Sequence, residues 1–151
     1  MPDIPLALTR RVAERAHYRC EYCHTPQVVT AQTFHVDHIV PQVLGGQAQL
    51  NNLCYACPHC NLHKSDRINA RDPRTGRMVR LFNPRIDHWD EHLRWSTTYT
   101  RLLPRTAIAR ATVATLDLNA NVFVKTRKLW LVLGLIPQGK SDPPAHWRHA
   151  S

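Results

Sequence analysis

The chain has 151 residues, the size of one compact domain, and its 20 Lys and Arg against 11 Asp and Glu leave a formal net charge of +9. So basic a chain favours a polyanionic partner, nucleic acid first of all. Its apolar runs are only a few residues long, whereas a membrane-spanning helix needs roughly 20, and its N-terminus lacks the basic and apolar stretches of a secretory signal. We therefore expect a cytoplasmic protein that does not cross a membrane.

The first half of the chain predicts a helix, two strands and a second helix. These elements are expected at about residues 10–16, 34–39, 53–56 and 58–69. Thr9 is the expected N-cap of the first helix, and Pro41 with Gly45 and Gly46 predicts a loop between the strands. Pro58 stands in the first turn of the second helix, where its missing N–H costs nothing.

The second half predicts a small hairpin and three helices. The hairpin turn is expected at residues 72–76, and the helices at about residues 87–96, 107–118 and 122–133. One face of the last helix carries its apolar stripe, and Gly134 is its expected C-cap. The stripe consists of Val122, Thr126, Leu129 and Leu133. From about residue 137, prolines and few apolar side chains predict a loosely ordered tail.

Four of the five cysteines form two Cys-x-x-Cys pairs, Cys20 with Cys23 and Cys57 with Cys60. In a reducing compartment this spacing favours a metal site over disulfides. Four thiolates can hold one tetrahedral zinc ion and leave no open position for a substrate, so we expect a structural zinc site. Cys54 could replace Cys60 in the second pair, but it stands in an apolar segment, where a free cysteine serves as a small hydrophobic residue.

The excess of positive charge lies beyond residue 60. Residues 1–60 carry four basic and four acidic side chains, whereas residues 61–151 carry sixteen and seven. Sixteen of the twenty basic residues are Arg, whose planar fork suits phosphate. Five of them follow one another in the hairpin region, where alternate positions can face DNA or can protect a solvated strand edge. They are Arg71, Arg74, Arg77, Arg80 and Arg85.

A second group of residues with a recognisable spacing lies between the cysteine pairs and just after them. Its members are Asp37, His38, Gly45, Gly46, Asn52, Asn61 and Lys64. Together with the four cysteines, they give a pattern that resembles the zinc-supported HNH endonucleases, the His-metal finger nucleases. The resemblance continues into the C-terminal extension of small bacterial HNH proteins and covers roughly residues 10–137.

This resemblance implies an α+β fold with a ββα-metal core, similar to a treble clef, and a mainly helical C-terminal extension. The nuclease core, with its N-terminal helix and zinc site, would occupy residues 1–70. A basic extension packed on the core would cover residues 71–136, and a flexible tail would cover residues 137–151.

The resemblance also implies a metal-dependent endonuclease that hydrolyses phosphodiester bonds in DNA and, as a monomer, nicks one strand. His38 would be the general base that takes a proton from the attacking water. Asp37 and Asn61 would hold a divalent cation, Mg²⁺ or another, and Asn52 would pin the loop that carries His38. A regular strand points Asp37 and His38 to opposite faces, so the strand must end there if both are to serve one phosphate.

Residues around Asn61 are the expected DNA contacts, namely His63, Lys64 and Arg67. Of these, His63 stands two residues after Asn61, so on a regular helix the two side chains face different directions. His35 can add a ligand or a phosphate contact, or it can be an ordinary strand histidine.

A hypothesis of a different class is a zinc-stabilised nucleic-acid-binding module without catalysis, because zinc and positive charge fit it equally well. The combination of base, carboxylate and amide at the spacing of the family favours the enzyme. RNA is a lesser variant of the substrate, since no RNA-binding module is recognisable. The oligomeric state stays open.

Overall fold

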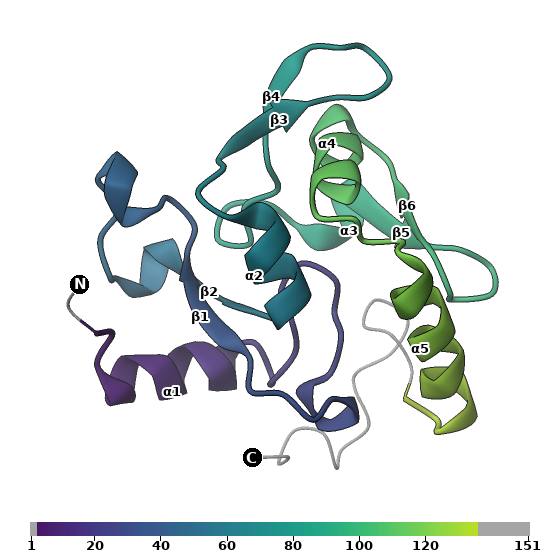
Figure 1. Ribbon diagram of the computed structural model, residues 1–151, viewed down its shortest axis with the longest axis horizontal. Helices are drawn as coiled ribbons and strands as arrows, with labels where there is room; N and C mark the ends of the chain where they lie inside the picture. The colour runs from purple at the N-terminus through teal and green to yellow at the C-terminus, as the bar shows by residue number, and fades with distance from the viewer. Residues whose placement is uncertain (1–2, 136–151) are drawn as a thin grey trace.

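The computed structural model describes residues 3–135, which form a mixed arrangement of short helices and strands (Figure 1). The helices are α1 (Leu6–Arg15), α2 (Pro58–Lys64), α3 (Trp89–His92), α4 (Ala107–Thr115) and α5 (Asn121–Val132). The strands are β1 (His35–His38), β2 (Leu53–Ala56), β3 (Asn69–Arg71), β4 (Met78–Arg80), β5 (Leu93–Trp95) and β6 (Leu102–Pro104). They form three separate antiparallel pairs, β1 with β2, β3 with β4 and β5 with β6.

The β1–β2 pair lies between α1 and α2, and both helices pack against it. Its register places His35 opposite Ala56 and His38 opposite Leu53. All four residues of β2 are buried, as a short apolar strand covered by helices should be. The loop between the strands contains two 3₁₀ turns, Gln42–Leu44 and Leu50–Asn52.

The C-terminal part is built around α4, which packs against β3, β4 and β6. The Thr106 side chain caps this helix by accepting a hydrogen bond from the Ala109 N–H at 3.1 Å. Thr112 Oγ1 accepts a hydrogen bond from the Phe82 N–H at 2.9 Å. In the β3–β4 turn, both carboxylate oxygens of Asp72 accept hydrogen bonds from the Arg110 guanidinium at 2.8 Å. These bonds fasten the hairpin to α4.

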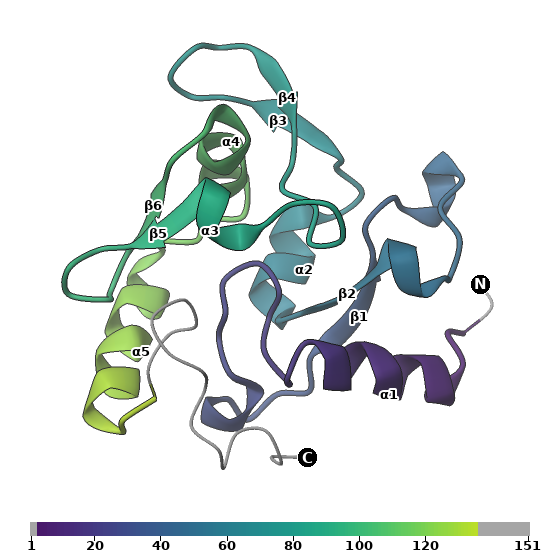
Figure 2. The ribbon, with the colours of Figure 1, turned by 180° about the vertical axis from the view of Figure 1, so that it is seen from behind.

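One cluster of buried apolar side chains joins the two parts of the chain. It includes Val12 and Phe34 from the N-terminal part and Leu93, Leu116 and Phe123 from the C-terminal part. Figures 1 and 2 show α2 between the β1–β2 pair on one side and α4 and α5 on the other. The C-terminal extension therefore shares a core with the segment that carries the cysteines.

Most of the predicted elements are confirmed, but the bounds of several helices differ, and the helix predicted over residues 107–118 ends at Thr115. The first helix begins at Leu6, so Thr9 lies inside it, and its N-cap Pro5 supplies no side-chain hydrogen bond. The second helix ends at Lys64, because Ser65 adopts a positive φ of 50°. The segment expected as a helix over residues 87–96 divides into the one-turn α3 and β5.

The predicted apolar face of the last helix is wrong. Val122, Leu129 and Leu133 are 62%, 60% and 66% exposed, whereas the buried face of α5 carries Phe123, Arg127 and Trp130. Because Arg127 stands at the centre of the buried face, the spacing of apolar residues alone does not predict which face of α5 is buried. Gly134, just after the helix, has the positive φ of 71° that suits its expected capping role.

Among residues 3–135, no helix is long and apolar enough to span a bilayer. The tail expected over residues 137–151 lies outside the described residues.

Candidate functional site

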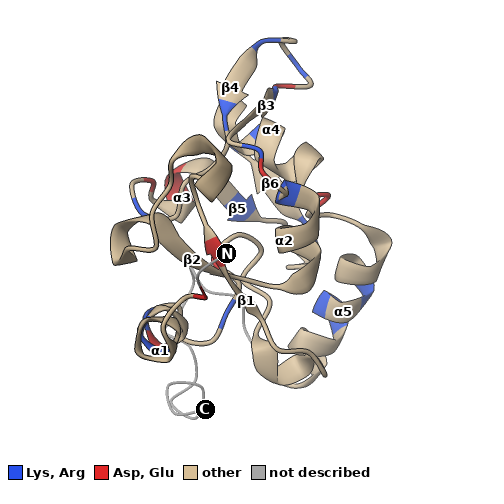
Figure 3. Cartoon of the chain, turned by 60° about the vertical axis from the view of Figure 1, so that its left-hand side comes forward, with Lys and Arg blue, Asp and Glu red and all other residues tan. Residues whose placement is uncertain are grey.

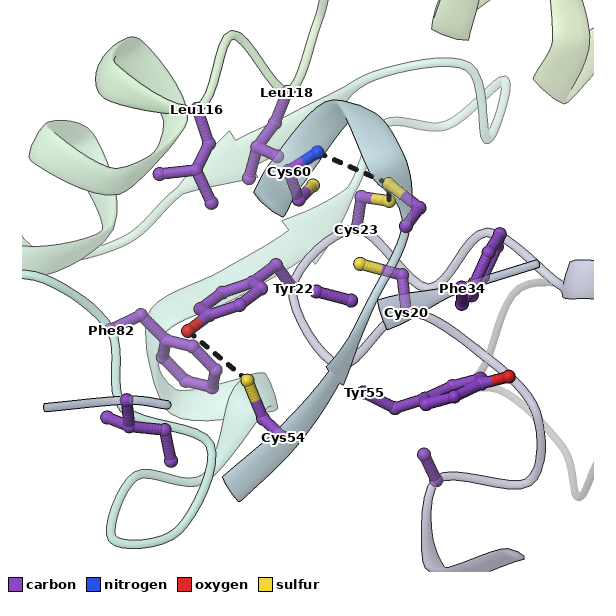
Figure 4. Close-up of a cluster of buried hydrophobic side chains, with 14 of the residues drawn as sticks. Cys20, Tyr22, Cys23, Phe34, Cys54, Tyr55, Cys60, Phe82, Leu116 and Leu118 are labelled. Atoms are coloured by element: carbon purple, nitrogen blue, oxygen red, sulfur yellow. Dashed lines mark hydrogen bonds between the residues drawn. The ribbon is translucent and has the colours of Figure 1, made fainter. Parts of the chain in front are cut away.

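The four cysteines of the two Cys-x-x-Cys pairs meet in the buried core. One Sγ from each of Cys20, Cys23, Cys57 and Cys60 lies within 4.8 Å of the others, and the Cys23 and Cys57 sulfurs are 3.7 Å apart. All four side chains are buried. Figure 4 shows the sulfurs of Cys20, Cys23 and Cys60 turned toward one another. The predicted four-cysteine cluster is confirmed, and its geometry fits a tetrahedral zinc ion.

Local backbone geometry explains why each pair presents its sulfurs together. The Cys20 N–H donates to Thr25 O and the His24 N–H donates to Cys20 O, which closes a tight turn around the first pair. In the second pair, Cys57 is the N-cap of α2, and its Sγ accepts from the Cys60 N–H at 3.4 Å. Burial favours neutral thiols, but the neighbouring cysteines and Thr25 lower the pKa of Cys23 well below its ordinary value. A thiolate is the form that binds zinc.

Cys54 is not part of this cluster. Its thiol donates to the Tyr22 hydroxyl at 3.6 Å and points away from the four sulfurs (Figure 4). Burial raises the pKa of the Cys54 thiol, so it stays protonated. The interpretation of Cys54 as a small buried residue, rather than as a ligand, agrees with this position.

A buried arginine that the sequence did not single out lies near the cysteine cluster. Arg127 donates hydrogen bonds to Leu118 O at 2.6 Å and Thr100 O at 3.0 Å, and its guanidinium lies 5.1 Å from the centre of the Phe123 ring. Burial lowers the pKa of Arg127, and the negative charge of nearby cysteines, Cys23 first, opposes this shift. A buried cation beside the cysteines partly offsets the charge of a zinc tetrathiolate.

The end of β1 holds Asp37 and His38. Lys64, from the last turn of α2, places its Nζ 3.5 Å from Asp37 Oδ2 and donates to the carbonyl oxygen of His38 at 3.3 Å. The contact with Asp37 is an ion pair without hydrogen-bond geometry, so Asp37 Oδ2 is buried with no hydrogen-bond partner within residues 3–135. His38 Nε2 is likewise buried and has no hydrogen-bond partner among the described residues. Burial raises the pKa of Asp37, and the Lys64 ammonium opposes part of that rise.

After His38 the strand pair keeps one more backbone hydrogen bond, from the Ile39 N–H to Asn52 O at 2.8 Å, and the Asn52 side chain then takes the place of a strand partner for Val40. Asn52 Oδ1 accepts from the Val40 N–H at 2.9 Å, and Nδ2 donates to Val40 O and to Gln47 O, both at 3.0 Å. Gly46 is required at this point, since a Cβ on it would lie 1.6 Å from Val40 O. These contacts fix the loop that follows His38.

Helix α2 divides the residues expected around Asn61 among different faces. Lys64 turns toward β1 and is only 2% exposed, so its ammonium lies beside Asp37. His63 turns the other way, and its ring stacks on that of His59 with centroids 4.0 Å apart. Arg67, just beyond the helix, is exposed. Asn61 and Lys64 are three residues apart, so the two side chains lie on neighbouring parts of the helix surface.

A cavity of about 180 Å³ opens beside Lys64, between the loop after β1 and the β3–β4 hairpin. Its lining includes Val40, Arg67, Asn69 and Asn83. It therefore offers polar and basic groups next to the end of β1.

The arginines of the hairpin region separate into those with a carboxylate partner and those without one among residues 3–135, although Arg71 donates a hydrogen bond to Gly76 O at 2.9 Å. Arg71, Arg74 and Arg77 are exposed at the end of the β3–β4 hairpin, which Figure 3 shows as a basic projection. Arg80 forms two hydrogen bonds with Asp87, at 2.6 and 2.7 Å, and Arg85 pairs with Glu21. Only the first three of the five arginines are thus available to a ligand.

The family model for "HNH endonuclease" matches residues 20–67, about a third of the chain. The matched segment runs from the first zinc-site cysteine through β1, the pinned loop and β2 to the end of α2. This match supports an HNH family protein. No curated protein and no solved structure matches the chain.

Proposed function

We propose that the protein is a metal-dependent HNH endonuclease that hydrolyses phosphodiester bonds in DNA. The observation that carries the proposal is the end of β1, inside the matched segment, where His38 Nε2 is buried without a hydrogen-bond partner in residues 3–135 and the neighbouring Asp37 carboxylate is ion-paired with Lys64. The four-cysteine cluster and the strand–loop–strand–helix order around it support a ββα-metal core. The basic hairpin supports a polyanionic substrate.

In this proposal His38 is the general base and takes a proton from the water that attacks the phosphate. The carboxylate of Asp37 and the amide oxygen of Asn61 are hard ligands that suit a divalent cation. Asp37 Oδ2 has the Lys64 ammonium at 3.5 Å but accepts no hydrogen bond within residues 3–135, so it keeps lone pairs for a metal ion. Mg²⁺ bound there would stabilise the negative charge of the phosphate and of the departing oxygen. Asn52 holds the loop after His38 in place.

Lys64 acts in this site as a positioning residue for Asp37. A buried ammonium beside a buried carboxylate favours the ionised form of the carboxylate, against the effect of burial, and the ionised form is the one that binds a cation. Arg67 and the exposed hairpin arginines, rather than Lys64, then supply the contacts to DNA phosphates.

A nicking assay on supercoiled plasmid tests the proposal by separating the roles of the three residues. His38→Ala should lower the nicking rate by a factor of about 10² to 10⁴, the usual effect of losing a general base, with little change in the Mg²⁺ concentration required. Asp37→Ala and Asn61→Ala should instead raise the Mg²⁺ requirement and recover part of their activity at high Mg²⁺. His88→Ala, which removes an exposed histidine, is the matched control.

The non-catalytic binding module is the alternative that this assay decides. If the wild-type protein binds plasmid but does not nick it with any divalent cation, or if His38→Ala nicks at the parental rate, the catalytic proposal is wrong. Chelation of the added cation should abolish nicking while the protein keeps its zinc, because the four-cysteine cluster is buried.

A further inference from the structure

A second group of metal-ligating side chains lies on the face of α2 that looks toward α4 and α5. His59, His63 and Asp117 each place one potential ligand atom within 4.8 Å of the other two. The two histidines are half-buried, and Asp117 is exposed just after α4. None of the three belongs to the four-cysteine cluster or to the end of β1.

The two histidines are preorganised by the helix and by their neighbours. They stand four residues apart, on one face of α2, and their rings stack with an interplanar angle of 21°. His63 Nδ1 lies 2.8 Å from His59 O, an oxygen that can only accept, so this nitrogen carries the proton and Nε2 keeps a free lone pair. Metal-binding histidines commonly use their other N–H in this way.

His59 is held at the end of α4. Its Nε2 lies 2.9 Å from Leu116 O and 3.2 Å from Asp117 O, and its ring packs edge-on against Phe123. These two carbonyls come from the same turn as the Asp117 carboxylate, and Asp117 adopts a positive φ of 49°. Because carbonyl oxygens only accept, His59 Nε2 carries the proton in these contacts and Nδ1 keeps the lone pair that can bind a metal ion. The same turn brings the Asp117 carboxylate near the two imidazoles.

We propose that His59, His63 and Asp117 form a second zinc site, separate from the four cysteines and from the site at the end of β1. Two imidazoles and a carboxylate are ligands that suit Zn²⁺, whose bonds to them are about 2.0–2.2 Å long. Ligand atoms up to 4.8 Å apart are too far apart for such bonds, so zinc binding requires the exposed Asp117 side chain to rotate and the two imidazoles to turn out of their stacked arrangement. A zinc ion there crosslinks α2 to the α4–α5 turn.

Calorimetric titration of Zn²⁺ into the full chain, with the four-cysteine site already filled, tests this inference. With excess Mg²⁺ present to occupy the proposed site at the end of β1, we expect one further equivalent of zinc to bind. His63→Ala and Asp117→Asn should each weaken it by a factor of about ten or more, because even the loss of an outer partner of a ligand costs about 10–100-fold. Asn tolerates the positive φ at position 117, so the second variant keeps the fold.

Two controls keep this result separate from the proposed nuclease site. Asp37→Asn and His88→Ala should retain the further equivalent, and elemental analysis should still find the first zinc in every variant. Absence of a further equivalent in the wild-type protein would overturn the inference. So would binding that survives in both His63→Ala and Asp117→Asn, or binding lost in Asp37→Asn alone.

Discussion

Replacing Asn52 with alanine removes three hydrogen bonds that hold the loop after His38. Two of them satisfy the N–H and the C=O of Val40, which is partly buried, and the third reaches the more exposed Gln47 O. A net value of about 0.5–1.5 kcal/mol for each of the three bonds gives a loss of about 1.5–4.5 kcal/mol in the free energy of unfolding, and the unpaired N–H and C=O of Val40 favour the upper part of this range. Urea unfolding of the zinc-loaded protein measures this loss.

Asn51→Ala is the matched control, because Asn51 is exposed in the same 3₁₀ turn. It should change the unfolding free energy by less than about 0.5 kcal/mol. Asn52→Ala should also slow nicking while leaving the Mg²⁺ requirement unchanged, since Asn52 positions the loop and binds no cation in our proposal. Equal stability of the two variants would refute the account of Asn52 as the residue that holds the loop after His38.

Three further predictions concern the zinc site, an ion pair and the basic hairpin. Cys60→Ser should lose zinc and cooperative unfolding, because structural zinc contributes about 10 kcal/mol or more to the free energy of folding. Cys54→Ser should keep the metal. Elemental analysis with the opposite result would reverse the ligand assignment. The hydrogen bonds from Arg110 hold the pKa of Asp72 below its ordinary value, so this pair stabilises the fold above about pH 4 and does so less as the pH falls. The difference in unfolding free energy between wild type and Asp72→Asn should therefore shrink on acidification. A difference that stays constant with pH would contradict this account. Replacing exposed hairpin arginines with alanine should make the dependence of log affinity for duplex DNA on log salt shallower by about 0.9 per phosphate contact, and an unchanged slope would mean that they only solubilise the surface. The arginines to replace are Arg71, Arg74 and Arg77.

The features that the sequence predicts well are those determined by a few neighbouring residues. The Cys-x-x-Cys spacing fixes which sulfurs can share an ion, and Pro58 marks the first turn of α2. Pro41 with Gly45 and Gly46 predicts the loop between β1 and β2. Each depends on local covalent geometry, so no knowledge of the tertiary packing is needed to infer it.

The features that the sequence does not predict depend on contacts between distant segments. Lys64 has the residue type of a phosphate contact, but its burial follows from the place of α2 against β1. Arg127 would be assigned to the surface, yet carbonyl oxygens from two other segments accept its hydrogen bonds in the core. Similarly, Asp117 stands more than fifty residues beyond His59 and His63, and no spacing rule connects them. The residue type alone does not show whether a polar side chain will find a hydrogen-bond or ion-pair partner inside the fold.

Helix α2 explains how the C-terminal extension and the proposed site depend on each other. A helix of seven residues is too short to be stable alone, so its position comes from tertiary contacts. Cys57 and Cys60 attach it to the cysteine cluster, Lys64 attaches it to the end of β1, and His59 attaches it to the last turn of α4. Because these contacts lie on different faces of a helix of two turns, a shift at one of them moves the other two. The extension is therefore part of the scaffold that places Lys64 beside Asp37, and its role is not confined to carrying basic charge.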